Sequence, residues 1–295
     1  MTGAAAAPNW RGALPTTSGL VEIDEAIRLM QRSQELKPIG RIAEASNASF
    51  LCEIDGGLQV IYKPIRGELP LWDFPEGSLA ARETAAYLVS ESLGLGVVPP
   101  TILRDGPAGE GAVQLWIDHV GVHRAVDLVN ASDEGLRRLA LFDAIVNNGD
   151  RKGGHILPLP DGRILGVDHG VTFAVEPKLR TVLWAWRSKP FTDDERTVIA
   201  SGVQGLTDNG ALRAQLSPIL DGEEIDAMAA RLSDLAATSG TTFAAASTPS
   251  SGFAAICRIA SSVAAMKARI ASRLLSIVLG EEMRPGPANG AAAEA

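Results

Sequence analysis

The order of strand-like and helix-like patterns limits this chain to few folds. Residues 37–63 show two or three β-type runs divided by small polar turns, and Asp55-Gly56-Gly57 is a hairpin signal. Residues 77–94 combine strong helix formers with a Ser near the start and a Gly just past the end, which predicts a helix. Strands and helices do not alternate regularly, so the pattern favours two lobes over a doubly wound sheet.

The second half of the chain is mainly helical in pattern. Residues 97–105 and 111–118 predict two more strands, and a helical pattern then runs from Ser132 to Ile145. A polar loop follows, and residues 155–168 predict a hairpin around Asp161-Gly162. Residues 192–236 predict further helices. The expected fold class is therefore α+β, with a β-rich first lobe and a helical second lobe.

Composition excludes several classes of function. The 295 residues are 46% hydrophobic and 21% charged, as in an ordinary globular protein. A net charge of −8 argues against binding nucleic acid, which requires clustered Lys and Arg. Cys52 and Cys257 lie far apart and have no metal-ligand spacing. No secretory signal and no run of about 18 apolar residues is visible, so we expect a cytoplasmic protein.

The same patterns predict four segments. They are a flexible leader at 1–19, a first lobe at 20–117, a second lobe at 118–238 and an Ala/Ser-rich tail at 239–295. In the tail, residues 254–279 have apolar side chains at steps of three and four with basic ones between them. This pattern predicts an amphipathic helix that either packs on its own domain or contacts a membrane surface or a protein partner.

Lys63 ends the strand-like run "VIYKP", and Glu83 lies in the helix predicted twenty residues later. Alone, each residue is more typical of an exposed side chain. In this order, however, the carboxylate of Glu83 can hold the ammonium of Lys63 and direct it at a phosphate.

Two other segments have weaker signals for nucleotide binding. The tip "EASNASF", with Ser46, Asn47 and Ser49, is either an ordinary turn or a turn whose backbone N–H groups approach phosphate oxygens. The run "VQLWID", with Gln114, Trp116 and Ile117, is either a plain strand or the connection where the backbone contacts an adenine.

The loop "VNNGDRKGGHIL" at 146–157 is either a surface turn or a catalytic loop. Asp150 lies within it, and Asp168 follows 18 residues later at the end of the predicted hairpin. Because a hairpin returns the chain to its start, both carboxylates are expected at one site. There they can orient a hydroxyl and hold a divalent cation.

Taken together, six blocks resemble the actinobacterial phosphatidylinositol 3/4-kinase-like family, which is related to HipA and has a protein-kinase-like fold. The resemblance covers residues 37–236. The blocks are "VIYKPIRGELPLWDFPEGSLAARETAAYLVSESLG", "VPPTILRDGP", "VQLWID", "FDAIVNNGDRKGGHIL" and "GVDHG", preceded by the strand-rich start.

The resemblance implies an ATP-dependent phosphotransferase that moves a γ-phosphoryl group to a hydroxyl of a protein, small-molecule or lipid acceptor. Lys63 would contact the α- and β-phosphates, held by Glu83. Asp150 would be the catalytic Asp, and Arg151 would balance developing charge. Asp168 would bind Mg²⁺, with Mn²⁺ as an alternative.

His155 departs from the family pattern, which has Asn at this position as an oxygen ligand of the second metal. An imidazole offers only nitrogen, so His155 either accepts one metal, favours Mn²⁺, acts behind the ligands, or packs in the loop. Asn147 and Asn148 are alternative oxygen donors. Two other functions therefore stay open: a pseudokinase or nucleotide-binding module without turnover, and a metal-dependent hydrolase that uses Asp150, His155, Asp168 and His169.

Overall fold

The structure, a computed structural model, describes residues 12–42 and 47–237. Contacts divide the chain into two compact units, Met1–Ser247 and Thr248–Ala295, and all described residues belong to the first. The expected leader therefore falls partly, and the tail with residues 254–279 wholly, outside the described residues.

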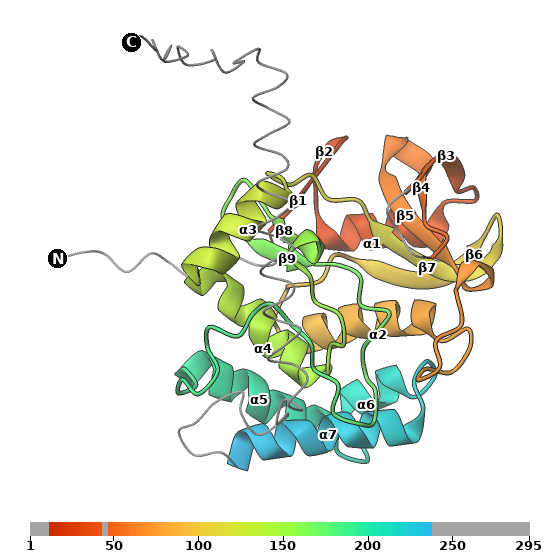
Figure 1. Cartoon of the computed structure of the whole chain (residues 1–295). Helices are drawn as coiled ribbons and strands as arrows, with labels where there is room; N and C mark the ends of the chain where they lie inside the picture. The colour runs from red at the N-terminus through yellow and green to blue at the C-terminus, as the bar shows by residue number, and fades with distance from the viewer. Residues whose placement is uncertain (1–11, 43–46, 238–295) are drawn as a thin grey trace, which may run out of the picture. The chain divides into compact units, whose positions relative to one another are not determined.

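A five-stranded antiparallel sheet forms the N-terminal part, with the strand order β3-β4-β5-β7-β6 (Figure 1). Its strands are β3 (Lys37–Arg41), β4 (Phe50–Glu53), β5 (Gln59–Pro64), β6 (Thr101–Gly106) and β7 (Gly109–Leu115). The turn between β4 and β5 contains the 3₁₀ segment η1 (Asp55–Gly57), so the hairpin predicted there is confirmed.

The two faces of this sheet differ because side chains alternate along each strand. On one face Val60 and Tyr62 of β5 are buried against a core that includes Met30 of helix α1 (Ile23–Arg32). The alternate residues of the same strand, Ile61 and Lys63, point to the other face and are only partly buried. Helix α2 (Leu79–Ser92) lies on that second face.

Helix α2 confirms the helix predicted at 77–94. Ser78 precedes it, but its hydroxyl donates to the carbonyl of Pro75 and caps no helical N–H. Instead, the carboxylate of Glu68 accepts hydrogen bonds from the backbone N–H groups of Leu79 (3.2 Å) and Ala80 (2.8 Å). Gly94, past the C-terminus, has a φ of 66°, the left-handed conformation that glycine adopts readily.

The C-terminal part is helical and shares one large core with α2. Its helices are α3 (Val122–Ala131), α4 (Arg137–Ile145), α5 (Asp193–Gly205), α6 (Ala211–Leu216) and α7 (Gly222–Ala237). Short 3₁₀ segments are η2 (Ile65–Gly67), η3 (Glu134–Leu136) and η4 (Gly153–His155). Strands β8 (Ile156–Pro158) and β9 (Ile164–Gly166) pair in the predicted hairpin. The expected α+β fold, with a β-rich N-terminal part and a helical C-terminal part, is thus confirmed.

Two elements differ from the expectations. The end of the expected leader forms strand β1 (Leu14–Thr16), in which Leu14 is buried, and β1 pairs with β2 (Gly19–Val21) in a small hairpin. This hairpin is held by distant partners, because Arg163 donates to the carbonyls of Gly12 and Ala13. Helix α3 occupies residues 122–131, for which no element was predicted.

Candidate active site

Lys63 of β5 is the cation at the centre of the site. Its ammonium forms an ion pair with the carboxylate of Glu83 in α2, and its Nζ lies 3.1 Å from Oδ1 of Asp168. Burial alone would lower the pKa of Lys63, but the two carboxylates outweigh it and raise that pKa above its ordinary value. The lysine is therefore charged at any physiological pH.

Glu83 joins the sheet to the segment after β9. The side chain is 3% exposed, and its second oxygen accepts a hydrogen bond from the backbone N–H of His169 at 3.0 Å. One buried carboxylate thus fixes both the ammonium of Lys63 and the backbone beside Asp168. The predicted pairing of Lys63 with Glu83 is present.

Asp168 presents a carboxylate to solvent that is ionised near neutral pH. Lys63 is the main reason that its pKa falls from 3.8 to about 2. The backbone of Asp168 has a φ of 63°, in the left-handed region that is uncommon for a residue with a side chain. Its side chain is 53% exposed, so the carboxylate is accessible to a bound ligand.

His155 lies against the same carboxylate, with its Nε2 3.3 Å from Oδ2 of Asp168. Burial lowers the pKa of His155 further than Asp168 raises it, so the imidazole is neutral near pH 7. Its Nδ1 is buried and has no hydrogen-bond partner among the described residues. A neutral imidazole beside an ionised carboxylate fits one divalent cation, whose other ligands would come from phosphate oxygens and water.

Asp150 lies in the loop between α4 and β8. Its backbone N–H is held by Oδ1 of Asn148 at 3.0 Å, and its carboxylate accepts a hydrogen bond from Lys152 at 2.7 Å. The side chain is 44% exposed. Burial lowers the pKa of His155, and the charge of Asp150 opposes part of that effect.

Arg151 is placed inside the protein, so the charge-balancing part expected for it does not fit its surroundings. Its guanidinium is fully buried and forms an ion pair with the equally buried Asp143 of α4. It also donates to the carbonyls of His155 (3.2 Å) and Val167 (2.8 Å), and its Nη2 lies 2.6 Å from Nε2 of His169. Arg151 thus positions the loop and the chain before Asp168 without reaching a ligand.

The amide side chains near Asp150 also have internal partners. Asn147 donates to the carbonyls of Ala174 and Glu176, and its oxygen accepts from the N–H of Lys178. Asn148 donates to Asp143. Both residues are buried, so the structure does not turn them toward a metal at Asp168.

The remaining predicted nucleotide contacts lie on or beside the sheet. Ser46 is outside the described residues, the oxygen of Asn47 accepts from Leu69 N–H at 2.8 Å, and Ser49 is buried. Gln114 is also buried and donates to Thr101. The backbone N–H of Trp116 donates to the carbonyl of Gln59. The side chain of Ile117 packs in the core on the sheet face opposite to Lys63.

Sequence reasoning missed Asp143, Lys152 and the buried part played by His169. A carboxylate inside the apolar run "LALFDAIV" was the available signal for Asp143, since such a residue is buried only with a partner. The pKa of His169 is held well below its usual value by burial and by Arg151, so its imidazole is neutral. Its side chain is fully buried, and its Nε2 is engaged by Nη2 of Arg151 at 2.6 Å.

Within 12–42 and 47–237 no three His, Cys, Asp or Glu side chains form a cluster that could hold a metal alone. None of the described helices is long and apolar enough to cross a bilayer.

Comparisons with known proteins place the chain in a family but give it no activity. No family model matches it. It is 45% identical over 241 residues to Protein Rv2133c from Mycobacterium tuberculosis, covering 68% of this chain and 85% of that protein.

Three solved structures resemble the fold weakly. The crystal structure of a Golgi casein kinase is 15% identical in sequence and has a TM-score of 0.46, and the match covers 72% of this chain and 73% of the kinase chain. The structure of the Golgi casein kinase with Mn/ADP bound is also 15% identical and has a TM-score of 0.48, and the match covers 72% of this chain and 74% of that chain. The Helicobacter pylori proinflammatory kinase CtkA is 13% identical and has a TM-score of 0.40, and the match covers 68% of this chain and 91% of the CtkA chain. Because these TM-scores are below 0.5, the function has to be judged from the side chains.

Proposed function

This chain belongs to the family of Protein Rv2133c from Mycobacterium tuberculosis, and we propose that it is an ATP-dependent phosphotransferase acting on a hydroxyl group. The observation that carries the proposal is the contact of Lys63 with both Glu83 and Asp168. The three side chains come from a strand, a helix and a loop, which are far apart in the sequence. An ammonium held in this way between an internal and an exposed carboxylate is arranged to bind phosphate beside a metal-binding group.

The carboxylate of Asp168 and the imidazole of His155 would hold the divalent cation of the nucleotide. That cation neutralises charge on the phosphates when it is bound. Mg²⁺ prefers oxygen ligands, whereas Mn²⁺ accepts the nitrogen of an imidazole more readily. We therefore expect activity with Mn²⁺ to equal or exceed activity with Mg²⁺.

Asp150 is the proposed residue that orients the acceptor. Its carboxylate is exposed and its backbone is fixed by Asn148, so it can accept a hydrogen bond from an incoming hydroxyl. Lys152 lies on the same carboxylate and supplies a positive charge beside the group to be transferred. Most of the rate acceleration would then come from positioning and charge neutralisation.

Incubation with γ-labelled ATP and either Mg²⁺ or Mn²⁺ tests the proposal. Mass spectrometry of the protein and of a cell lysate would identify the product. Asp150→Asn and Asp168→Asn should each lower transfer by at least a hundredfold, whereas Asp105→Asn, an exposed carboxylate on the far end of β6, should leave it unchanged. Unaltered transfer in either of the first two variants contradicts the proposal.

A second candidate is a nucleotide-binding module without turnover. It is favoured by His155, whose imidazole contacts the carboxylate of Asp168 at a position where the family pattern has an oxygen ligand. Isothermal titration with ATP and each metal, beside the transfer assay, separates the two candidates. Tight binding without any phosphorylated product would establish the module.

A further inference from the structure

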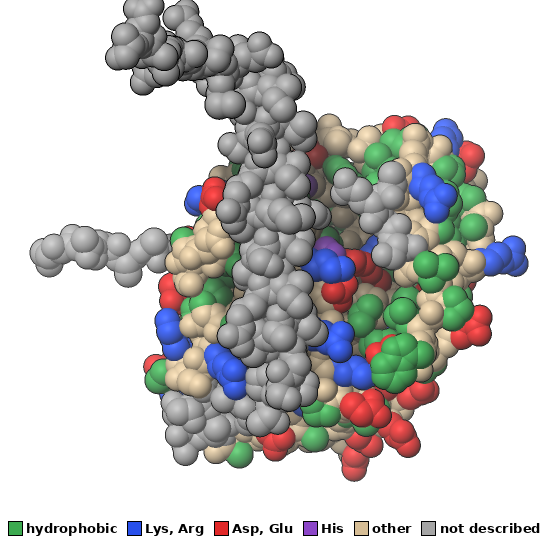
Figure 2. All heavy atoms as spheres, viewed as in Figure 1, with side chains coloured by type: hydrophobic (Ala, Val, Ile, Leu, Met, Phe, Trp, Pro, Cys, Tyr) green, Lys and Arg blue, Asp and Glu red, His purple; other side chains and the backbone are tan. Residues whose placement is uncertain are grey.

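An exposed apolar surface lies on the loop that follows β5 and on the chain after Asp168. It consists of Leu69, Leu71, Trp72 and Val175, and is called the apolar surface below. Trp72 is 94% exposed and Leu69 is 58% exposed. The rings of Trp72 and Phe74 both lie beside Nζ of Lys178, and Phe74 lines one hollow with Val175, so the loop and the later segment meet here. Exposed large apolar side chains at such a place indicate a contact with another molecule. Figure 2 shows hydrophobic side chains gathered beside acidic ones on part of the face it presents.

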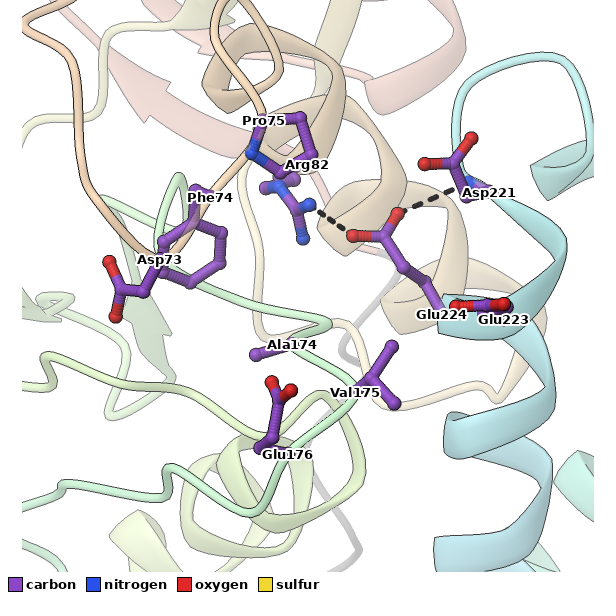
Figure 3. A pocket seen from close by; sticks show the side chains of 10 residues that line it. All are labelled: Asp73, Phe74, Pro75, Arg82, Ala174, Val175, Glu176, Asp221, Glu223 and Glu224. Atoms are coloured by element: carbon purple, nitrogen blue, oxygen red, sulfur yellow. Dashed lines mark hydrogen bonds and ion pairs between the residues drawn. The ribbon is translucent and has the colours of Figure 1, made fainter.

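A hollow of about 240 Å³ adjoins this surface and is distinct from the Lys63–Asp168 cluster (Figure 3). Val175 belongs to both, and Phe74, two residues after Trp72, forms part of the wall. The hollow is lined by Asp73, Phe74, Pro75, Arg82, Ala174, Val175, Glu176, Asp221, Glu223 and Glu224.

The hollow has an uncompensated negative charge. The one cation in its lining, Arg82, is buried and paired with Glu224, and Asp73 is paired with Lys178 at 3.0 Å. Glu176, Asp221 and Glu223 remain exposed and form no ion pair among the described residues. Three free carboxylates beside an apolar surface attract a ligand that is both cationic and apolar.

The walls of the hollow continue directly from the candidate active site. The loop with Trp72 and Phe74 begins just after Lys63, and the segment with Val175 and Glu176 begins just after Asp168. Asn147 holds this segment through the carbonyls of Ala174 (2.9 Å) and Glu176 (2.7 Å), three residues before Asp150. Arg82 in the lining directly precedes Glu83 in α2, so the hollow and the Lys63–Asp168 cluster share this helix.

We propose that the apolar surface and the acidic hollow dock a polypeptide acceptor that has Lys or Arg next to a large apolar side chain. The inference rests on the proposed function, because it names the class of hydroxyl acceptor. An anionic phosphoinositide headgroup is disfavoured, since the three free carboxylates would repel it. Trp72 provides the broad apolar contact, and Glu176 and Glu223 provide the charge.

Two fluorescent Ser-containing peptides test the docking surface. Both have one Leu and one Phe, but one has two Arg where the other has two Glu. Fluorescence anisotropy measures binding, and γ-labelled ATP measures transfer. The basic peptide should bind the wild-type chain at least tenfold more tightly than the acidic peptide and should be the better acceptor.

Matched variants locate the effect. Glu176→Gln/Glu223→Gln should raise the Kd and KM of the basic peptide about fivefold, as expected for two exposed ion pairs of about 0.5 kcal/mol each. Trp72→Ala should weaken both peptides. The kcat and the ATP-binding affinity should not change, and Glu35→Gln/Glu110→Gln, with two exposed carboxylates elsewhere, should behave as wild type.

Equal binding of the two peptides, or preferential binding and phosphorylation of phosphatidylinositol vesicles, would overturn the docking proposal. Charge-selective peptide binding that is lost in Glu176→Gln/Glu223→Gln, but without any transfer, would support docking and contradict only the phosphotransferase function. The two proposals can therefore fail independently.

Discussion

At the residue scale, Arg151 joins three segments through one guanidinium. It contacts Asp143 in α4, the carbonyl of His155 in the loop and the carbonyl of Val167 before Asp168. Asp143 accepts further hydrogen bonds from Asn148 and Thr181, so no part of this buried pair is left without a partner. This network fixes the loop of Asp150 against the segment of Asp168.

Arg151→Met should therefore destabilise the protein by about 3–5 kcal/mol, because it leaves the Asp143 carboxylate buried without its cation. Adding Asp143→Leu should restore part of the loss, since the unpaired charge is then removed. Urea unfolding measures both values. Arg66→Met, at an exposed arginine, is the control and should change stability by less than about 0.5 kcal/mol. A loss as small as the control's would show that the pair contributes little.

The lowered pKa of Asp168 predicts that the stability of the fold decreases in acid. Its pKa in the folded protein is lowered from 3.8 to about 2, so its carboxylate stabilises the fold above about pH 4 and this contribution is lost as pH falls toward 2. The stability difference between wild type and Asp168→Asn should thus be constant from pH 7 to 5 and shrink below pH 4. Urea unfolding across this range checks it. A difference that grows on acidification would contradict the assigned ion pair with Lys63.

Contacts between site residues could be predicted from the sequence more accurately than the burial of those residues. Lys63 and Glu83 pair as expected, because the order of strand and helix places them on facing elements. The burial of Arg151 was not predicted, because a basic residue after Asp150 gives no local sign of burial. Its burial depends on Asp143 and on carbonyls of segments far along the chain.

At the element scale, α5 is the helix with a complete capping box. Thr192 accepts from the N–H of Glu195 at 3.2 Å, and Glu195 accepts from the N–H of Thr192 at 2.8 Å. Thr192→Ala should cost about 1 kcal/mol in unfolding free energy, because one N–H of the first turn loses its acceptor. Thr197→Ala, in the exposed middle of the same helix, should cost nothing or stabilise slightly. Equal losses in the two variants would contradict a capping role.

The elements that the sequence missed share a physical cause. Helix α3 buries only Ala125 and Leu128, and it exposes Val122 and Val126, which blurs the helical period of apolar residues. Strand β1 has three residues within an Ala- and Thr-rich stretch and depends on a distant arginine. Elements with strong local patterns, such as α2 and the hairpin of β8 and β9, were predicted well.

At the scale of the whole molecule, α2 connects the two expected lobes. Its Lys63-facing side contacts the sheet through Glu83, while Ala85 and Val89 belong to the core of the C-terminal helices. The described residues accordingly fall in one compact unit. Such sharing of a helix between two layers depends on tertiary contacts, which composition and periodicity do not reveal.

A ligand that binds residues from both parts should stabilise the whole unit. ATP with Mn²⁺ at 100 times its Kd should add about 2.7 kcal/mol, which corresponds to a rise in Tm of roughly 5–10 °C for a domain of this size. Lys63→Met should abolish this rise in Tm, because the phosphates lose their cation while Asp168 still binds the metal. Thermal unfolding monitored by fluorescence measures the Tm of both proteins. If metal alone raised the Tm as much as metal with ATP did, the cluster around Asp168 would be a metal site without a nucleotide, as a metal-dependent hydrolase requires.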